Sequence, residues 1–166
     1  MSSVEIRPGT IEDVPVILNF IKSLAEYEKM ADQVVATEDI LRQTLFGERR
    51  YAEVIIAYAK PTPESELEPA GMALFFHNFS TFQGRPGIYL EDLFVHSQFR
   101  GMGIGKKLLI QLAALAKERQ CARYEWVCLD WNKSSRDFYE ALGAKPQSEW
   151  IIYRVEGKSL DDLAAM

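Results

Sequence analysis

Three glycines separated by single residues lie between a predicted strand and a predicted helix, with a basic residue on either side. The segment contains Arg100, Gly101, Met102, Gly103, Ile104, Gly105 and Lys106. Glycines at the start of a helix leave backbone N–H groups open to an anion, and the two basic side chains add positive charge. We therefore expect this loop to bind a phosphate or pyrophosphate group.

Two common phosphate-binding loops do not match the segment. A P-loop requires glycine where Arg100 stands and serine or threonine where Lys107 stands. A dinucleotide fingerprint requires the spacing G-x-G-x-x-G within a parallel βαβ unit, whereas this loop has G-x-G-x-G after strands that we expect to be antiparallel. A turn that merely links a strand to a helix is the structural alternative.

Two adjacent acids, Glu91 and Asp92, interrupt the apolar run YLEDLFV. Side chains alternate along a regular strand, so the two acids point to opposite faces unless a bulge intervenes. A carboxylate in such a position could accept a proton or bind a cation. An ion-paired acid near the surface of the sheet is the structural alternative for each of them.

Composition limits the classes of protein that these residues could serve. The chain has 166 residues, 48% of them hydrophobic, and a net charge of −5, which predicts one globular domain over residues 1–166. The acidic balance argues against a nucleic-acid partner. We expect neither a membrane span nor a signal peptide, since no apolar run is long enough. Two cysteines and two histidines predict neither a disulfide framework nor a metal site, and they favour a cytoplasmic location.

Hydrophobic periodicity predicts the elements that position the loop and the acids. The expected order is βααβββαβαβ, an α/β chain with a mixed, mostly antiparallel sheet flanked by helices. We expect helices from Thr10 to about Tyr27, from Thr37 to Gly47, after the glycine loop, and from Asn132 to Leu142, with Gly143 ending the last. Strands are expected at residues 4–8, 51–60, 70–79, 87–95, 122–128 and 149–155.

The pattern R-x-x-G-x-G formed by Arg100, Gly103 and Gly105 resembles the acetyl-CoA-binding signature of the GNAT N-acetyltransferases. The run from Asn132 to Gly143, NKSSRDFYEALG, is similar to the second half-motif of that family. The resemblance implies a GNAT fold that transfers acetyl from acetyl-CoA to an amine without a metal ion. It also implies a ternary complex in which the amine attacks the thioester directly.

The resemblance carries roles to particular residues. It implies that Tyr139 lies beside the sulfur, where a phenol, close to a thiol in acidity, could protonate the departing thiolate. A core aromatic paired with Phe138 is the alternative. It implies that Glu91 is the base, acting through water. Acetyl-CoA would be bound by the glycine loop, by Tyr139 and by five further residues, namely Leu93, Phe94, Val95, Asn132 and Ser135. Asn132 could instead be only a helix cap.

A narrower resemblance concerns the acceptor. The segments AEYEKM, TEDIL, FGE and YLEDLFV resemble the spermidine/spermine and thialysine N-epsilon-acetyltransferases. This implies a homodimer that acetylates a small cation bound by Tyr27, Glu28, Glu91, Asp92 and Glu149. The chain lacks an acid of the polyamine pattern near Ser80, which weakens the case for long polyamines. A protein-acetylating enzyme and a non-catalytic acyl-CoA-binding module are the rival functions.

Overall fold

A computed structural model describes residues 3–166 of the chain. These residues form two compact units, the first ending at Val127 and the second beginning at Cys128. The units are described separately below. In the part of the chain that the structure describes, no helix combines the length and the apolar character needed to span a bilayer.

The first unit is built on a five-stranded sheet with the order β1-β2-β3-β4-β5. The first four strands pair antiparallel and the last pairs parallel to β4, which confirms the predicted mixed, mostly antiparallel sheet. Their bounds are β1 (Val4–Pro8), β2 (Glu53–Ala59), β3 (Glu68–Ser80), β4 (Arg85–Val95) and β5 (Tyr124–Glu125). The strand expected over residues 122–128 is therefore only two residues long.

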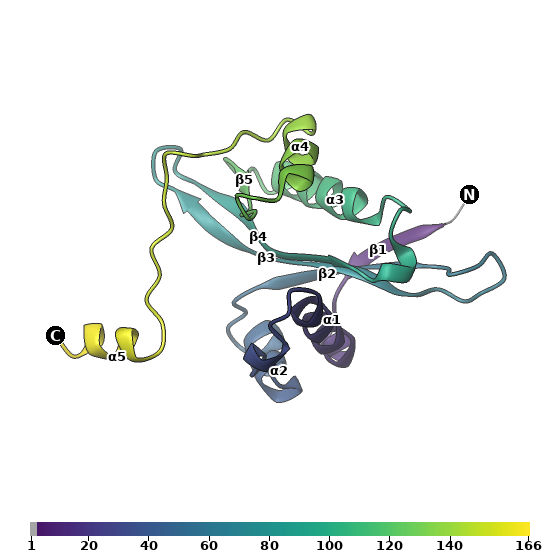
Figure 1. Ribbon diagram of the computed structural model, residues 1–166, viewed down its shortest axis with the longest axis horizontal. Helices are drawn as coiled ribbons and strands as arrows, with labels where there is room; N and C mark the ends of the chain where they lie inside the picture. The colour runs from purple at the N-terminus through teal and green to yellow at the C-terminus, as the bar shows by residue number, and fades with distance from the viewer. Residues whose placement is uncertain (1–2) are drawn as a thin grey trace. The chain divides into compact units, whose positions relative to one another are not determined.

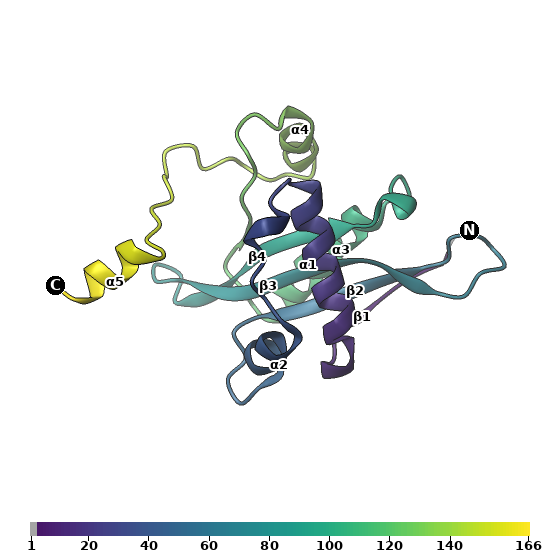
Figure 2. The same ribbon diagram turned by 60° about the horizontal axis from the view of Figure 1, so that its bottom comes forward.

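Helices cover both faces of this sheet. Figure 1 shows α1 (Val14–Tyr27) and α2 (Glu38–Phe46) on one face and α3 (Ile104–Glu118) on the other. In Figure 2, α1 runs across the strands. Its apolar face is buried with side chains of the sheet and of α2 in one core, which includes Val14, Ile17, Phe20, Leu41, Leu45, Val54, Ile56, Met72 and Phe94.

The predicted helix starts are confirmed by their capping bonds. The backbone N–H of Thr10 donates to the Asp13 carboxylate over 2.7 Å, ahead of a 3-10 turn that leads into α1. The hydroxyl of Thr37 accepts from the backbone N–H of Ile40 over 3.2 Å at the start of α2. These bonds satisfy donors that the first turn of a helix leaves without a partner.

The second unit contains α4 (Lys133–Ala141) and α5 (Lys158–Ala164). Asn132 caps α4, because its side-chain oxygen accepts from the N–H of Ser135 over 3.2 Å. Gly143 follows the helix with φ of 96°, and the N–H of Ala144 donates to the carbonyl of Tyr139 over 3.1 Å. This is the Schellman ending that a glycine after a helix predicts.

The predicted last strand is wrong for the chain as the structure describes it. Residues 149–155 pair with no strand, and α5 beyond them was not predicted. Their large side chains are exposed: Trp150 by 81%, Ile151 by 75%, Ile152 by 66% and Tyr153 by 90%. A run of β-branched and aromatic residues indicates a preference for a strand, but a strand also requires a neighbour for its backbone groups.

Candidate functional site

The two adjacent acids lie at a bulge in β4. Asp92 is paired with Leu74 and Leu90 with Phe75, so Glu91 has no partner in the register with β3. An unpaired residue of this kind interrupts the alternation of side chains along a strand. The sequence allowed Glu91 and Asp92 to point to one side of the sheet only if a bulge lay between regular parts of the strand, and the structure has that bulge. Glu91 is exposed, whereas Asp92 is partly buried.

Asp92 has a strongly perturbed carboxyl group. Its pKa is raised to about 6, chiefly by burial and in addition by the negative charges of Glu91 and Glu28. Glu28 follows α1, so the acids come from two elements that are distant in sequence. Negative charges that raise the pKa of a partly buried carboxyl group favour a cation beside it. Within residues 3–166, no group of three or more His, Cys, Asp or Glu side chains is arranged to hold a metal ion.

The glycine loop has a backbone that other residues rarely adopt. Gly101 and Gly103 have φ of 82° and 72°, and a Cβ built on either would meet no atom within 4 Å. The left-handed backbone therefore requires glycine, while the space around both stays open. The first turn of α3 follows directly, with N–H groups that have no acceptor within the helix. These features fit the predicted anion site.

Two of the predicted cofactor residues, Ile104 and Phe94, have buried side chains. The side chain of Ile104 is 1% exposed and that of Phe94 is 6% exposed, and both belong to the core. Any contact that they make with a cofactor must therefore use the backbone. Met102 and Lys106 lie in the same segment, with Lys106 exposed in the first turn of α3.

The end of β4 offers a free backbone edge. Leu93, Phe94 and Val95 pair with β3 on one side. On the other side β5 pairs only with Ile88 and Tyr89, so no strand among residues 3–166 pairs with the last residues of β4 there. An extended chain could add to this edge through its own amides. The predicted contact between these residues and a pantetheine arm requires such an edge.

Four predicted site residues belong to the second unit. Asn132 and Ser135 form the cap of α4 described above, so the structural alternative for Asn132 is confirmed as one of its roles. Burial raises the pKa of Tyr139, and the nearby Cys128 adds to that rise, so the phenol stays protonated at neutral pH. Glu149 is exposed. The grouping of these residues with Glu91 in one site stays a prediction.

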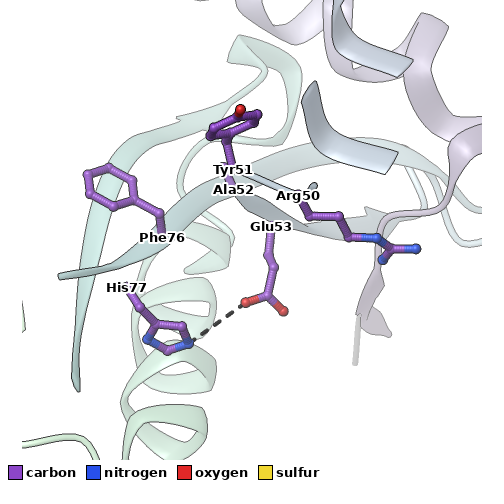
Figure 3. Close-up of a pocket in the computed structure, with 6 residues that line it drawn as sticks. All are labelled: Arg50, Tyr51, Ala52, Glu53, Phe76 and His77. Carbon is purple, nitrogen blue, oxygen red and sulfur yellow. Dashed lines mark ion pairs between the residues drawn. The ribbon is translucent and has the colours of Figure 1, made fainter. Parts of the chain in front are cut away.

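A surface pocket lies elsewhere on the first unit. Figure 3 shows the residues that line it, which are Arg50, Tyr51, Ala52, Glu53, Phe76 and His77. None of them is a predicted site residue. Arg119, which caps α3, donates to the carboxylate of Glu53 over 2.6 and 2.8 Å and to Nε2 of His77 over 2.8 Å. Because arginine only donates, Nε2 of His77 accepts in this arrangement and its Nδ1–H donates to the carbonyl of Gly87 over 2.9 Å. The dashed line in Figure 3 marks the 3.9 Å approach of His77 Nε2 to the Glu53 carboxylate.

The hydrogen bonds of Arg119 link the end of α3 to Glu53 on β2 and His77 on β3. The hydrogen bond from Arg119 lowers the pKa of Glu53. Sequence analysis missed the network because its members are far apart along the chain. The pocket therefore has a structural explanation and no link to acyl transfer.

Comparisons with known proteins show the family to which the chain is similar. Residues 22–144 match the model of the acetyltransferase (GNAT) family. The chain is 39% identical to the thialysine N-epsilon-acetyltransferase of Sus scrofa, over 99% of both chains. It is 29% identical to an L-ornithine N5-acetyltransferase of Arabidopsis thaliana, over 93% of this chain and 85% of that protein.

A solved structure matches the whole chain as well. An integron cassette protein from the mobile metagenome of V. cholerae superposes with a TM-score of 0.78 at 30% identity, over 99% of each chain. The match to the family model spans both compact units, because it begins before Val127 and ends after Cys128.

Proposed function

The chain belongs to the GNAT acetyltransferase family and is an acetyl-CoA-dependent N-acetyltransferase, and we propose that its acceptor is a primary amine of a small cation. The observation that carries this proposal is the raised pKa of Asp92 beside Glu91 and Glu28. An ammonium group bound among three carboxylates would relieve their mutual repulsion, so binding a cation is favourable there.

Two relatives support a short acceptor. The proteins matched at 39% and 29% identity are named for thialysine and for L-ornithine. Both compounds are amino acids with a primary amine at the end of a short chain. We therefore rank thialysine-like amino acids first as acceptors and diamines second. Long polyamines rank lower, because Ser80, Thr81 and Phe82 supply no acid in the hairpin between β3 and β4.

The proposed reaction is direct attack by the amine on the thioester carbon in a ternary complex. Glu91 accepts the proton that the ammonium group loses, through a water molecule. The amine nitrogen bonds to the carbonyl carbon, the carbon–sulfur bond breaks, and Tyr139 donates a proton to the departing thiolate. The second proton that the nitrogen loses as the amide forms passes through water to the Tyr139 oxygen, which restores the phenol. The raised pKa of Tyr139 means that the phenol carries its proton at neutral pH, as a proton donor must.

Acetyl-CoA is proposed to bind along the glycine loop and the end of β4. The N–H groups at the start of α3, with Arg100 and Lys106, would hold its phosphates. The free edge of Leu93–Val95 would pair with the pantetheine arm, and Asn132, Ser135 and Tyr139 are proposed as further cofactor-binding residues. One domain over residues 1–166 is part of this proposal, and the family match across both units supports it.

We further propose that the enzyme is a cytoplasmic homodimer. The dimer is supported by residues 149–155, whose exposed apolar side chains are more than a monomer ordinarily leaves in water. The sheet also ends at β5, whose outer edge pairs with no strand among residues 3–166.

The cytoplasmic location is supported by cysteine usage, because two cysteines cannot form a disulfide framework.

The dimer can be tested by light scattering during gel filtration. The unchanged chain should elute with the mass of two copies, and Ile151→Glu with Ile152→Glu should shift it toward the monomer. Lys158→Glu, on α5, is the matched charge-changing control and should stay dimeric. A monomeric unchanged protein at tens of micromolar would rule the dimer out.

An acceptor screen tests the function itself. Purified protein and acetyl-CoA would be offered thialysine, lysine, ornithine, putrescine, spermidine and a lysine-containing peptide, with free CoA release measured for each. We expect the highest kcat/KM with thialysine or ornithine. Preferential acetylation of the peptide would overturn the small-cation assignment, and CoA binding without turnover on any amine would favour a regulatory module.

A further inference from the structure

Residues at the end of α1 interact with both parts of the proposed site, the acids of β4 and the glycine loop. Glu28 raises the pKa of Asp92 in the acid cluster. Its neighbour Tyr27 lies under the glycine-loop residue Arg100, whose guanidinium carbon is 4.8 Å from the centre of the Tyr27 ring. A guanidinium group at that distance from an aromatic face makes a cation–π interaction. One helix end thus acts electrostatically on the acceptor side and contacts the cofactor side.

The stack leaves Arg100 able to bind an anion. Its Nε donates to the carbonyl of Val95 over 3.3 Å. The two terminal nitrogens donate no hydrogen bond to any of residues 3–166, and the side chain is exposed. A planar guanidinium group stacks through its face and donates through its edge. The ring and an anionic ligand can therefore hold the same arginine at once.

Tyr27 is presented by a well-anchored helix end. The N–H of Met30 donates to the carbonyl of Ala25 over 2.7 Å, and the N–H of Lys29 to that of Glu26 over 3.1 Å. Lys29 has φ of 59°, which completes a Schellman ending. Earlier in α1, the ring of Phe20 lies 4.8 Å from that of His96, just beyond β4. The helix is therefore tied to the strand that leads into the glycine loop.

We propose that Tyr27 is a positioning residue for acetyl-CoA, whose ring holds Arg100 with its terminal nitrogens directed outward to receive the phosphates. This inference rests on the proposed function and assigns Tyr27 a role beyond acceptor binding. Without the ring, Arg100 would have to be ordered when the cofactor binds, and the entropy lost at that step would weaken binding.

The first test measures acetyl-CoA binding by calorimetry in the absence of any amine. An exposed cation–π contact contributes about 0.5–1 kcal/mol, so Tyr27→Ala should raise the Kd about two- to fivefold. Tyr27→Phe keeps the ring and should keep the Kd of the unchanged protein. Tyr27→Leu, which keeps apolar bulk without the aromatic face, should behave like Tyr27→Ala. Because Tyr27 is 68% exposed, all three variants should fold, which circular dichroism would verify.

The second test separates positioning from a general disturbance. S-acetylpantetheine carries the thioester but no pyrophosphate, so Tyr27→Ala should lower kcat/KM for acetyl-CoA about two- to fivefold more than it lowers kcat/KM for S-acetylpantetheine, because any loss of acceptor binding affects both donors alike. In an Arg100→Ala background, Tyr27→Ala should have no further effect on the Kd of acetyl-CoA.

Three results would overturn the inference: an unchanged or tighter Kd in Tyr27→Ala, an equal loss with S-acetylpantetheine, or additive effects with Arg100→Ala. A failure of the proposed function looks different, since the unchanged protein would then acetylate no small amine, whatever Tyr27 does to cofactor binding.

Discussion

The carboxyl group of Asp92, on β4, lies within the electrostatic reach of Glu28, at the end of α1, and this contributes to a pKa of about 6. Burial is the largest cause, and Glu91 adds to it. Repulsion between these carboxylates lowers the free energy of unfolding. The proposed role of the cluster is to bind a cation.

Removing the Asp92 charge should stabilise the protein at neutral pH. The pKa of Asp92 lies above the ordinary value of 3.8, so only well below pH 3.8 is the group neutral in both the folded and the unfolded state. As the pH rises from there through 6, the folded state comes to bear the cost of a buried, repelled charge, and that cost is complete above pH 6. Asp92→Asn should therefore raise the free energy of unfolding by about 2 kcal/mol at pH 7.5 and by much less at pH 4.

Urea denaturation at the two pH values measures this difference. Glu64→Gln, in the exposed loop between β2 and β3, is the control and should have no effect at either pH. An equal gain for Asp92→Asn at pH 4 and pH 7.5 would contradict the assigned burial of charge.

The two acids of the bulge should differ in kinetics. Glu91→Gln should lower kcat about 100-fold or more and remove the acid limb of the pH profile of kcat/KM, because the proposed base is gone. Asp92→Asn should chiefly raise KM for a cationic acceptor, since it loses a charge that binds the ammonium group. Steady-state kinetics from pH 5 to pH 9 would test both, and an intact acid limb in Glu91→Gln would exclude Glu91 as the base.

The hydroxyl group of Tyr139 should matter for turnover rather than for folding. Tyr139→Phe should keep the melting temperature within a few degrees and lower kcat about 100-fold, because the proposed proton donor is lost. Tyr51→Phe, on an exposed tyrosine outside the proposed site, is the matched control and should keep full activity. Near-normal kcat in Tyr139→Phe would remove the acid assignment.

Gly103 should be required for both the turn and the cofactor. Gly103→Ala forces a Cβ onto a backbone with φ of 72° and should cost about 1–2 kcal/mol of stability. It should also raise the Kd for acetyl-CoA by at least tenfold, because the N–H groups of the loop move. Denaturation and calorimetry measure the two effects.

Gly84 provides the control for that substitution. It lies in the hairpin after β3 with φ of 64° and open space around it. Gly84→Ala should cost a similar amount of stability and leave the Kd unchanged. If both variants bind acetyl-CoA alike, the glycine loop is not the cofactor site.

The sequence alone determined the features that depend on neighbours along the chain. Thr37 and Asn132 cap the helices that they were predicted to cap, and Gly143 ends α4 with a positive φ. The glycine loop was recognised for the same reason, since backbone conformation and capping are decided within a few residues. The antiparallel sheet followed from alternating apolar runs joined by turns.

Tertiary structure decided what depends on residues far apart. The bulge at Glu91 exists because β4 must stay in register with β3 on both sides of it, and one strand alone does not reveal its partner's register. The stack of Arg100 on Tyr27 joins a loop to a helix end that only the packing of α1 against the sheet brings together. For residues 149–155, the residue types indicated a preference for a strand. A strand forms only when a neighbouring strand pairs with its backbone, and the residue types of the segment do not reveal whether such a neighbour exists.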